Sequence, residues 1–197
     1  MAQATATHPT LIGTLWPGET AKPLRLVALA VLGTALLTLS AKINIPFYPV
    51  PLTMQTFAVL VIAMAYGPRL GTATLILYMA EGAVGLPVFA GTPEKGIGLA
   101  YMMGTTGGYL LGFVLAAALC GWLAERGWDR RVGTTALAML LGNIVIYVPG
   151  LLWLGGLLGW DKPILEWGLT PFLLGDLAKL ALATAVLPFA WHLVKRR

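Results

Sequence analysis

Two charged residues, Asp176 and Lys179, lie in an otherwise apolar stretch near the C-terminal end of the chain. They are three positions apart, so on a helix they share one face. A charged side chain deep in a bilayer costs about 2.5–3.5 kcal/mol on insertion scales and persists where a bundle interior or a wet cavity receives it. The pair is either a self-neutralising ion pair or a binding site with an acceptor beside a cation. We favour the binding site, because ionisable residues inside membranes are usually functional.

The composition identifies the class of protein. Of the 197 residues, 58% are hydrophobic and 11% are charged, whereas a soluble domain carries about 25% charged residues. We therefore predict an all-α integral membrane protein. The net charge of +5 does not indicate nucleic-acid binding, because the charges lie at the ends of apolar segments. One cysteine and two histidines predict neither a disulfide within the chain nor a metal site.

The pattern of apolar segments predicts a six-transmembrane-helix bundle. A helix of about 20 residues spans a bilayer, and shorter spans are predicted where Gly67-Pro68 interrupts the pattern. The polar, small residues 1–23 are expected to form an N-terminal tail, and 24–197 one membrane domain. The predicted spans are residues 24–43, 53–66, 70–84, 104–124, 134–154 and 170–191.

Basic residues predict the orientation of this bundle. Nine of the 13 Lys and Arg residues lie in the tail, in the turns at 69 and 125–131, and at the C-terminus. Three, Lys42, Lys95 and Lys162, lie on the opposite side. The positive-inside rule then places both termini in the cytoplasm. The proline-containing turn at 44–52 and the long loop at 85–103 face outward, and a loop of that length is usually a lid or a binding loop.

Polar residues within the spans gather near the outward side. Gln55, Glu81 and Asp176 are each predicted to lie within about two turns of that edge. A channel would need polar groups through the full depth of the membrane, and the cytoplasmic halves of the spans are almost entirely apolar. The sequence therefore predicts a pocket that opens outward beneath a lid.

A stripe of small residues runs along one face of the first span, at Ala30, Thr34 and Thr38. Small residues at this spacing allow another helix to approach closely. The stripe either packs within the bundle or forms a docking face for a partner subunit.

Five motifs in a consistent order resemble the BioY family, the biotin-specific S components of energy-coupling factor (ECF) transporters. The resemblance covers roughly residues 24–194, and the chain departs from the family pattern at Thr105 and at 92–95 in the lid loop. The motifs are Pro49-Val-Pro-Leu-Thr-Met-Gln-Thr, Gly67-Pro-Arg-Leu-Gly, Gly85-Leu-Pro-Val-Phe-Ala-Gly, Gly107-Gly-Tyr-Leu-Leu-Gly-Phe and Gly175-Asp-Leu-Ala-Lys.

The resemblance implies a six-helix S component that binds biotin near the outer face of the bacterial cytoplasmic membrane. It also implies assembly with a transmembrane coupling protein and two ATPases. The family's Asp-x-x-Lys falls on Asp176 and Lys179, and its glutamine falls on Gln55. No cofactor is expected, and self-association is left open.

The chemistry of biotin fits the candidate residues. Asp176 can accept from a urea N–H, and Lys179 or Lys95 can meet the urea oxygen or the carboxylate. Neutral hydrogen bonds could come from Gln55 and Asn143, although Asn143 could instead join two helices by a hydrogen bond. The remaining candidates are Phe89 and Tyr109, which could cover the rings or belong to the core, and Glu81, which could instead pair with a neighbouring donor.

Two other classes of function are alternatives to a biotin-binding subunit. An ion- or proton-coupled secondary transporter of a small carboxylate-bearing solute would use Asp176 or Glu81 as its proton site, but such transporters often contain related halves, and no convincing repeat is present. An enzyme is not expected, because neither His8 nor His192 can reach the outer polar cluster. No Gly-Lys-Ser/Thr sequence is present for a phosphate-binding loop, so energy would come from partner ATPases.

Overall fold

The computed structural model describes residues 8–16, 22–45 and 48–195. Five helical segments in these ranges are long and apolar enough to cross a membrane, as the composition predicts. The elements are α1 (Leu11–Leu15), α2 (Lys22–Lys42), β1 (Asn44–Ile45), β2 (Leu52–Thr53), α3 (Gln55–Ala83), α4 (Gly98–Met102), α5 (Gly107–Ala124), the short 3-10 helix η1 (Trp128–Arg130), α6 (Val132–Leu158), α7 (Ile164–Gly168) and α8 (Thr170–Lys195).

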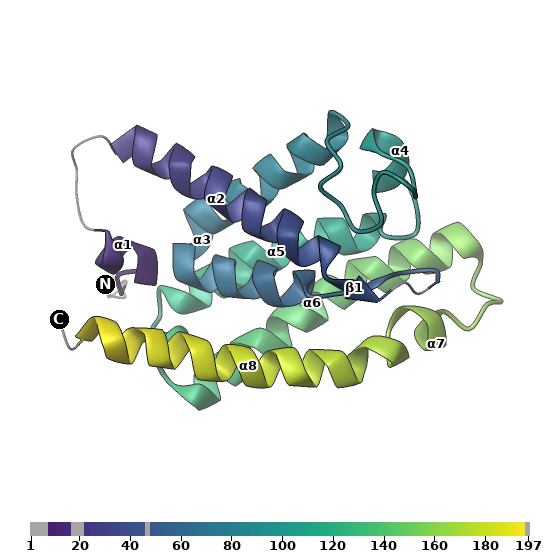
Figure 1. The fold of residues 1–197 in the computed structure, drawn as a ribbon. Helices are drawn as coiled ribbons and strands as arrows, with labels where there is room; N and C mark the ends of the chain where they lie inside the picture. The colour runs from purple at the N-terminus through teal and green to yellow at the C-terminus, as the bar shows by residue number, and fades with distance from the viewer. Residues whose placement is uncertain (1–7, 17–21, 46–47, 196–197) are drawn as a thin grey trace, which may run out of the picture.

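The long helices form one bundle, with α2 and α8 on opposite sides (Figure 1). The helix α2 packs on α3, α3 on α5, α5 on α6, and α6 on α8. The short helix α1 and the C-terminal end of α8 lie at one end of the bundle, whereas β1, α4 and α7 lie at the other (Figure 1). The second end is the one that the sequence predicts to hold the pocket.

The helix α3 covers both the second and the third predicted spans, so the structure has five long helices and not six. Gly67 nevertheless leaves the helical conformation, with φ at 81° and ψ at 177°. A Cβ atom placed on Gly71 would lie 3.1 Å from the Cα atom of Ala63, although residues eight apart in a straight helix are about 12 Å apart. The chain therefore reverses at Gly67, where a positive φ favours glycine, and the two arms of α3 diverge from this bend (Figure 1).

The predicted irregular turn after the first span contains a small hairpin. The strands β1 and β2 pair antiparallel, with Asn44 opposite Thr53. The hydroxyl of Thr105 donates to the carbonyl oxygen of Pro49 at 2.7 Å. The hairpin is therefore fastened to the start of α5, at the end of the bundle that carries α4 and α7.

Part of the predicted N-terminal tail packs on the bundle. Leu11 is buried, and the backbone N–H of His8 donates to the carbonyl oxygen of Glu125 at 2.7 Å. Residues 8–16 of the predicted tail therefore pack on the bundle, because Leu11 buries its side chain against the protein. Residues 1–7 and 17–21 of that tail, and the last two basic residues, Arg196 and Arg197, lie outside the described residues.

The small-residue stripe on α2 faces α3. Thr34 is only 3% exposed, and its hydroxyl donates to Oε1 of Glu81 at 2.9 Å. The hydroxyl of Thr38 donates to the carbonyl oxygen of Thr34, and Ala30 is half-buried. These contacts support packing within the bundle, the first of the two roles predicted for the stripe.

Candidate functional site

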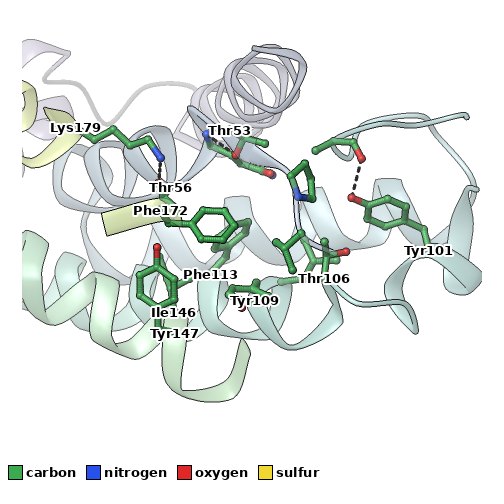
Figure 2. A pocket seen from close by; sticks show the side chains of 15 residues that line it. Thr53, Thr56, Tyr101, Thr106, Tyr109, Phe113, Ile146, Tyr147, Phe172 and Lys179 are labelled. Atoms are coloured by element: carbon green, nitrogen blue, oxygen red, sulfur yellow. Dashed lines mark hydrogen bonds between the residues drawn. The ribbon is translucent and has the colours of Figure 1, made fainter. Parts of the chain in front are cut away.

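A cavity lies between the ends of the long helices, next to the β1–β2 hairpin (Figure 2). The empty space between its lining atoms is about 520 Å³, and this volume includes open solvent at its mouth. Among the residues that line it, Lys179 is the one charged side chain. The lining residues are Val50, Pro51, Thr53, Gln55, Thr56, Ala90, Tyr101, Thr106, Tyr109, Leu110, Phe113, Ile146, Tyr147, Phe172 and Lys179.

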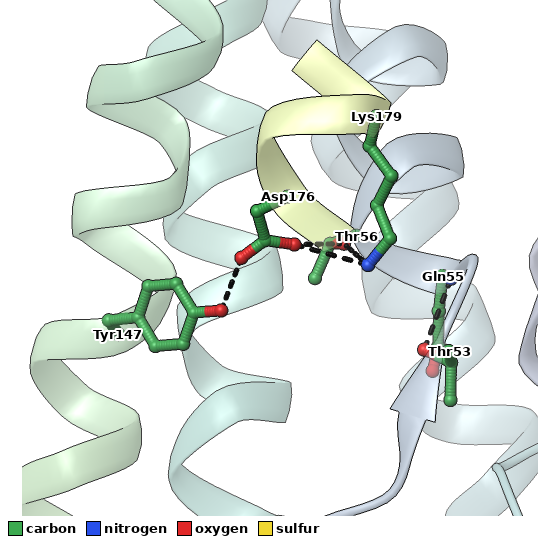
Figure 3. Close-up of polar contacts among 6 residues, drawn as sticks. All are labelled: Thr53, Gln55, Thr56, Tyr147, Asp176 and Lys179. Atoms are coloured by element: carbon green, nitrogen blue, oxygen red, sulfur yellow. Dashed lines mark hydrogen bonds and ion pairs between the residues drawn. The ribbon is translucent and has the colours of Figure 1, made fainter. Parts of the chain in front are cut away.

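The predicted pair on α8 forms an ion pair at the wall of this cavity. The Nζ atom of Lys179 lies 3.1 Å from Oδ1 of Asp176, and the two side chains are 14% and 9% exposed. Lys179 also donates to the hydroxyl of Thr56 at 3.0 Å. The Asp176 carboxylate lies between Tyr147 and Lys179 (Figure 3). The two charges neutralise each other, which lowers the cost of placing them in a membrane.

Asp176 is held on both of its oxygen atoms. Oδ2 accepts a short hydrogen bond from the hydroxyl of Tyr147, while Oδ1 is engaged by Lys179 and, at 3.5 Å, by Thr56. Asp176 does not itself line the cavity, although Tyr147, Thr56 and Lys179 do. In this conformation the carboxylate therefore orients three side chains that face the cavity.

Gln55 lies where the sequence predicts it, at the start of α3 and on the cavity wall. The side chain is 4% exposed, and its Nε2 donates to the hydroxyl of Tyr78 at 2.7 Å. Tyr78 in turn donates to the carbonyl oxygen of Val88 at 2.8 Å. This bond uses one N–H of Nε2, so Gln55 can offer its carbonyl oxygen and its second N–H to a ligand.

Aromatic rings form much of the remaining wall (Figure 2). The rings of Tyr109 and Tyr147 meet edge to face at 6.2 Å, and those of Tyr147 and Phe172 meet at 6.3 Å. The hydroxyl of Tyr109 donates to the carbonyl oxygen of Gly168 at 2.8 Å, so its ring is fixed in orientation. These rings give the cavity an apolar surface on which flat or aliphatic groups can pack.

Asn143 lies beside the cavity and not in its wall. It borders a small neighbouring space together with Thr56 and Lys179. Its Oδ1 atom is buried and has no hydrogen-bond partner among the described residues. The structure therefore places Asn143 next to the charged pair, without the interhelical hydrogen bond that the sequence left open for it.

Besides Asp176 and Asn143, three further predicted site residues do not line the cavity in this conformation. Glu81 accepts from Thr34 on α2, the pairing with a neighbouring donor that the sequence left open. Lys95 is exposed on the loop after α3. Phe89 is 1% exposed and packs behind the wall formed by Ala90 and Tyr101.

Several lining residues were not predicted. Thr56 directly follows Gln55 in the sequence, and Tyr147 lies four positions after Asn143, on the same face of a helix. Both signals were present, since each is a polar side chain in an apolar span. Phe113, Phe172 and Tyr101 carried no such signal, because an aromatic residue in a membrane helix is common.

The model of the BioY family matches residues 12–196. The chain belongs to the BioY family. Three of the motifs in which the sequence resembles this family lie at the site described above: one contributes Gln55 and Thr56 on α3, another Tyr109 and Phe113 on α5, and a third the charged pair on α8.

Several curated members of the BioY family are similar over most of the chain. A protein of Pyrococcus horikoshii named "Probable biotin transporter BioY" is 38% identical over 166 residues, which cover 84% of this chain and 94% of the relative. The "Biotin transporter BioY" of Thermotoga maritima is 38% identical over 157 residues, covering 78% and 88% of the two chains.

The fold is also similar to that of a solved structure. The crystal structure of the S-component for biotin from an ECF-type ABC transporter matches with a TM-score of 0.69 and 23% sequence identity. The match covers 87% of this chain and 93% of the other. This similarity confirms an S-component-like helical membrane fold.

Proposed function

We propose that this protein captures biotin in the cavity next to Lys179 and delivers it across the cytoplasmic membrane. The match to the BioY family over almost the whole chain carries this proposal. The placement of the Asp-x-x-Lys pair supports it, because Lys179 lines the cavity and Asp176, which is 9% exposed, pairs with it.

The cavity offers groups that suit each part of biotin. The ammonium of Lys179 can donate to the urea carbonyl or to the carboxylate, and a charge-assisted hydrogen bond is roughly twice as strong as a neutral one. The carbonyl oxygen of Gln55 can accept from a urea N–H. The rings of Tyr109, Phe113 and Phe172 can pack against the thioether ring and the aliphatic chain.

We assign Asp176 mainly to orienting its neighbours. Both of its oxygen atoms are engaged by Tyr147, Lys179 and Thr56. It can accept a urea N–H directly only if the ligand displaces one of these partners. In either role it keeps the cation of Lys179 compensated inside the membrane.

We further propose that the protein crosses the membrane six times, with both termini in the cytoplasm. The two arms of α3 run from the end that carries β1 to the end that carries α1 and back (Figure 1). Counting each arm as a crossing gives an even number. The excess of Lys and Arg at the end that carries α1 supports a cytoplasmic position for that end, with the cavity opening at the other.

Transport against a gradient needs an energy source outside this chain, since the sequence has no phosphate-binding loop. We propose a transmembrane coupling protein and two ATPase subunits as partners. A docking role for the stripe of Ala30, Thr34 and Thr38 would require the contact between α2 and α3 to open, because Thr34 is buried there. That role stays a prediction.

Uptake of radiolabelled biotin tests the proposed function. Cells that lack their own biotin transporter are given this chain with or without genes for the coupling protein and the ATPases. We expect accumulation of biotin above the external level only with the partners, and binding of biotin to membranes in both cases. Uphill accumulation that follows a proton gradient and needs no ATPase would favour the secondary transporter instead.

A further inference from the structure

The loop between α3 and α4 is fastened to the bundle at residues 88–92. Four of its carbonyl oxygens accept hydrogen bonds from side chains that belong to three helices. Tyr78 of α3 bonds Val88 at 2.8 Å, and Tyr101 of α4 bonds Ala90 at 2.8 Å (the latter is visible in Figure 2). Lys42 of α2 bonds the other two, those of Phe89 and Thr92.

Lys42 makes the largest number of these contacts. Its Nζ atom lies 3.0 Å from the carbonyl oxygen of Phe89, 2.8 Å from that of Thr92 and 3.0 Å from the hydroxyl of Thr92. An ammonium has three donors, so the three acceptors match it fully. No carboxylate of the described residues forms an ion pair with Lys42. The cation is therefore bound by the loop alone.

Aromatic packing of Phe89 also holds this segment. The ring of Phe89 stacks on Tyr101 at 5.0 Å and meets Tyr78 edge to face at 5.3 Å. Gly82 leaves the room for it, since a Cβ atom there would lie 2.0 Å from the Phe89 ring. Aromatic pairs of this kind stabilise a packed segment beyond the area that they bury.

This segment forms part of the cavity wall, because Ala90 and Tyr101 both line the cavity. Ala90 lies directly between Phe89 and Gly91 in the stretch that Lys42 spans. We infer that Lys42 is a positioning residue for the cavity, and that it fixes residues 89–92 as a wall tied to the end of α2. The sequence predicts a lid over the pocket, and these contacts fasten the inner half of that loop to α2, α3 and α4.

The inference rests on the proposed function only for the identity of the ligand. Two measurements on purified protein in detergent therefore test it. The first is hydrogen exchange of the amides of Val88 and Thr92 without biotin. The second is calorimetric titration with biotin. If the wild-type protein does not bind biotin, the proposed function fails, whereas the exchange measurement still tests the wall.

Lys42→Met keeps most of the stem and removes all three donors. The variant loses three hydrogen bonds from a charged donor. The carbonyl oxygens of Phe89 and Thr92 and the hydroxyl of Thr92 are then left without this donor. We expect exchange at residues 88–92 to become at least ten-fold faster and biotin to bind about ten-fold more weakly or worse. Lys162→Met is the matched control, because Lys162 is exposed and pairs only with Asp161, and it should change neither quantity.

Chemical rescue separates positioning from general destabilisation. Lys42 is exposed on average, so a small amine can reach its place. In Lys42→Ala, propylammonium restores the missing atoms and should recover slow exchange and tight biotin binding. Tetramethylammonium carries the same charge without an N–H donor and should recover neither. Lys42→Gln, which keeps one amide donor, replaces Lys42→Met if the methionine variant does not fold.

Wild-type exchange and wild-type affinity in Lys42→Met would overturn the inference. So would equal rescue by propylammonium and tetramethylammonium, since the effect would then be one of charge alone.

Discussion

We expect biotin affinity to fall by a factor of several hundred or more when Asp176 is replaced by alanine. The variant leaves the cation of Lys179 without its carboxylate, in a side chain that is 14% exposed. It also leaves the hydroxyl of Tyr147 without its acceptor. Removing one partner of a buried charged pair costs about 3–5 kcal/mol, and each 1.4 kcal/mol is a factor of ten in affinity.

Asp176→Asn is the matched variant for this prediction. It keeps the shape of the side chain and one oxygen for Tyr147 or Lys179, so the protein should fold better than Asp176→Ala. Binding should still be clearly weaker, because the hydrogen bond to Lys179 loses its anionic acceptor. Calorimetric titration with biotin measures both variants.

The double variant Asp176→Leu with Lys179→Leu distinguishes a binding site from a structural ion pair. Replacing a buried ion pair by apolar residues is often neutral for stability. If the pair were only structural, each single variant would express poorly and the double variant would fold and bind biotin normally. We expect the double variant to fold and to lose biotin binding, because Lys179 is the charged residue of the cavity wall.

Gly112→Ala is expected to destabilise the bundle and to widen the cavity. A Cβ atom on Gly112 of α5 would lie 2.7 Å from both the Cα atom and the carbonyl oxygen of Ile146 on α6. These are backbone atoms of a packed helix, so the two helices must separate. Overpacking of this kind costs about 1–3 kcal/mol, and Phe113 and Ile146 of the cavity wall move with the helices.

Gly156→Ala is the control for this prediction. Gly156 also lies on a long helix, α6, but a Cβ atom there meets nothing within 4 Å. Alanine is about 1 kcal/mol more favourable than glycine inside a helix, so this variant should be as stable as the wild type or more so. Thermal unfolding in detergent compares the two. Equal stability of Gly112→Ala and Gly156→Ala would show that α5 and α6 do not need this close approach.

Much of the fold follows from periodicity and composition. Apolar stretches of membrane length specify α2, α5, α6 and α8, because backbone groups in lipid must be paired within a helix. The break at Gly67 was visible as Gly67-Pro68, but whether the chain continues or reverses there depends on the packing of Gly71 against Ala63. The hairpin of β1 and β2 was missed because two-residue strands have no readable alternation.

The candidate site was partly predictable for a physical reason. Asp176, Lys179 and Gln55 are polar groups in apolar helices, and the cost of burying them identifies them from sequence. The cost of burial does not predict how these side chains are arranged relative to one another. The hydrogen bond between Tyr147 and Asp176 joins residues 29 positions apart. The bond from Lys42 to the loop at Phe89 joins residues 47 positions apart. Both depend on how distant parts of the chain come together.

Titration of the purified protein with biotin, for the wild type and for Lys179→Met, tests the central claim most directly. The claim is that biotin binds in the cavity whose wall carries Lys179 as its charged residue. We predict one biotin per wild-type chain and binding at least 100-fold weaker in the variant, corresponding to about 2.7 kcal/mol. Folded wild-type protein that does not bind biotin, or a Lys179→Met variant that binds it as tightly as the wild type, would contradict the account.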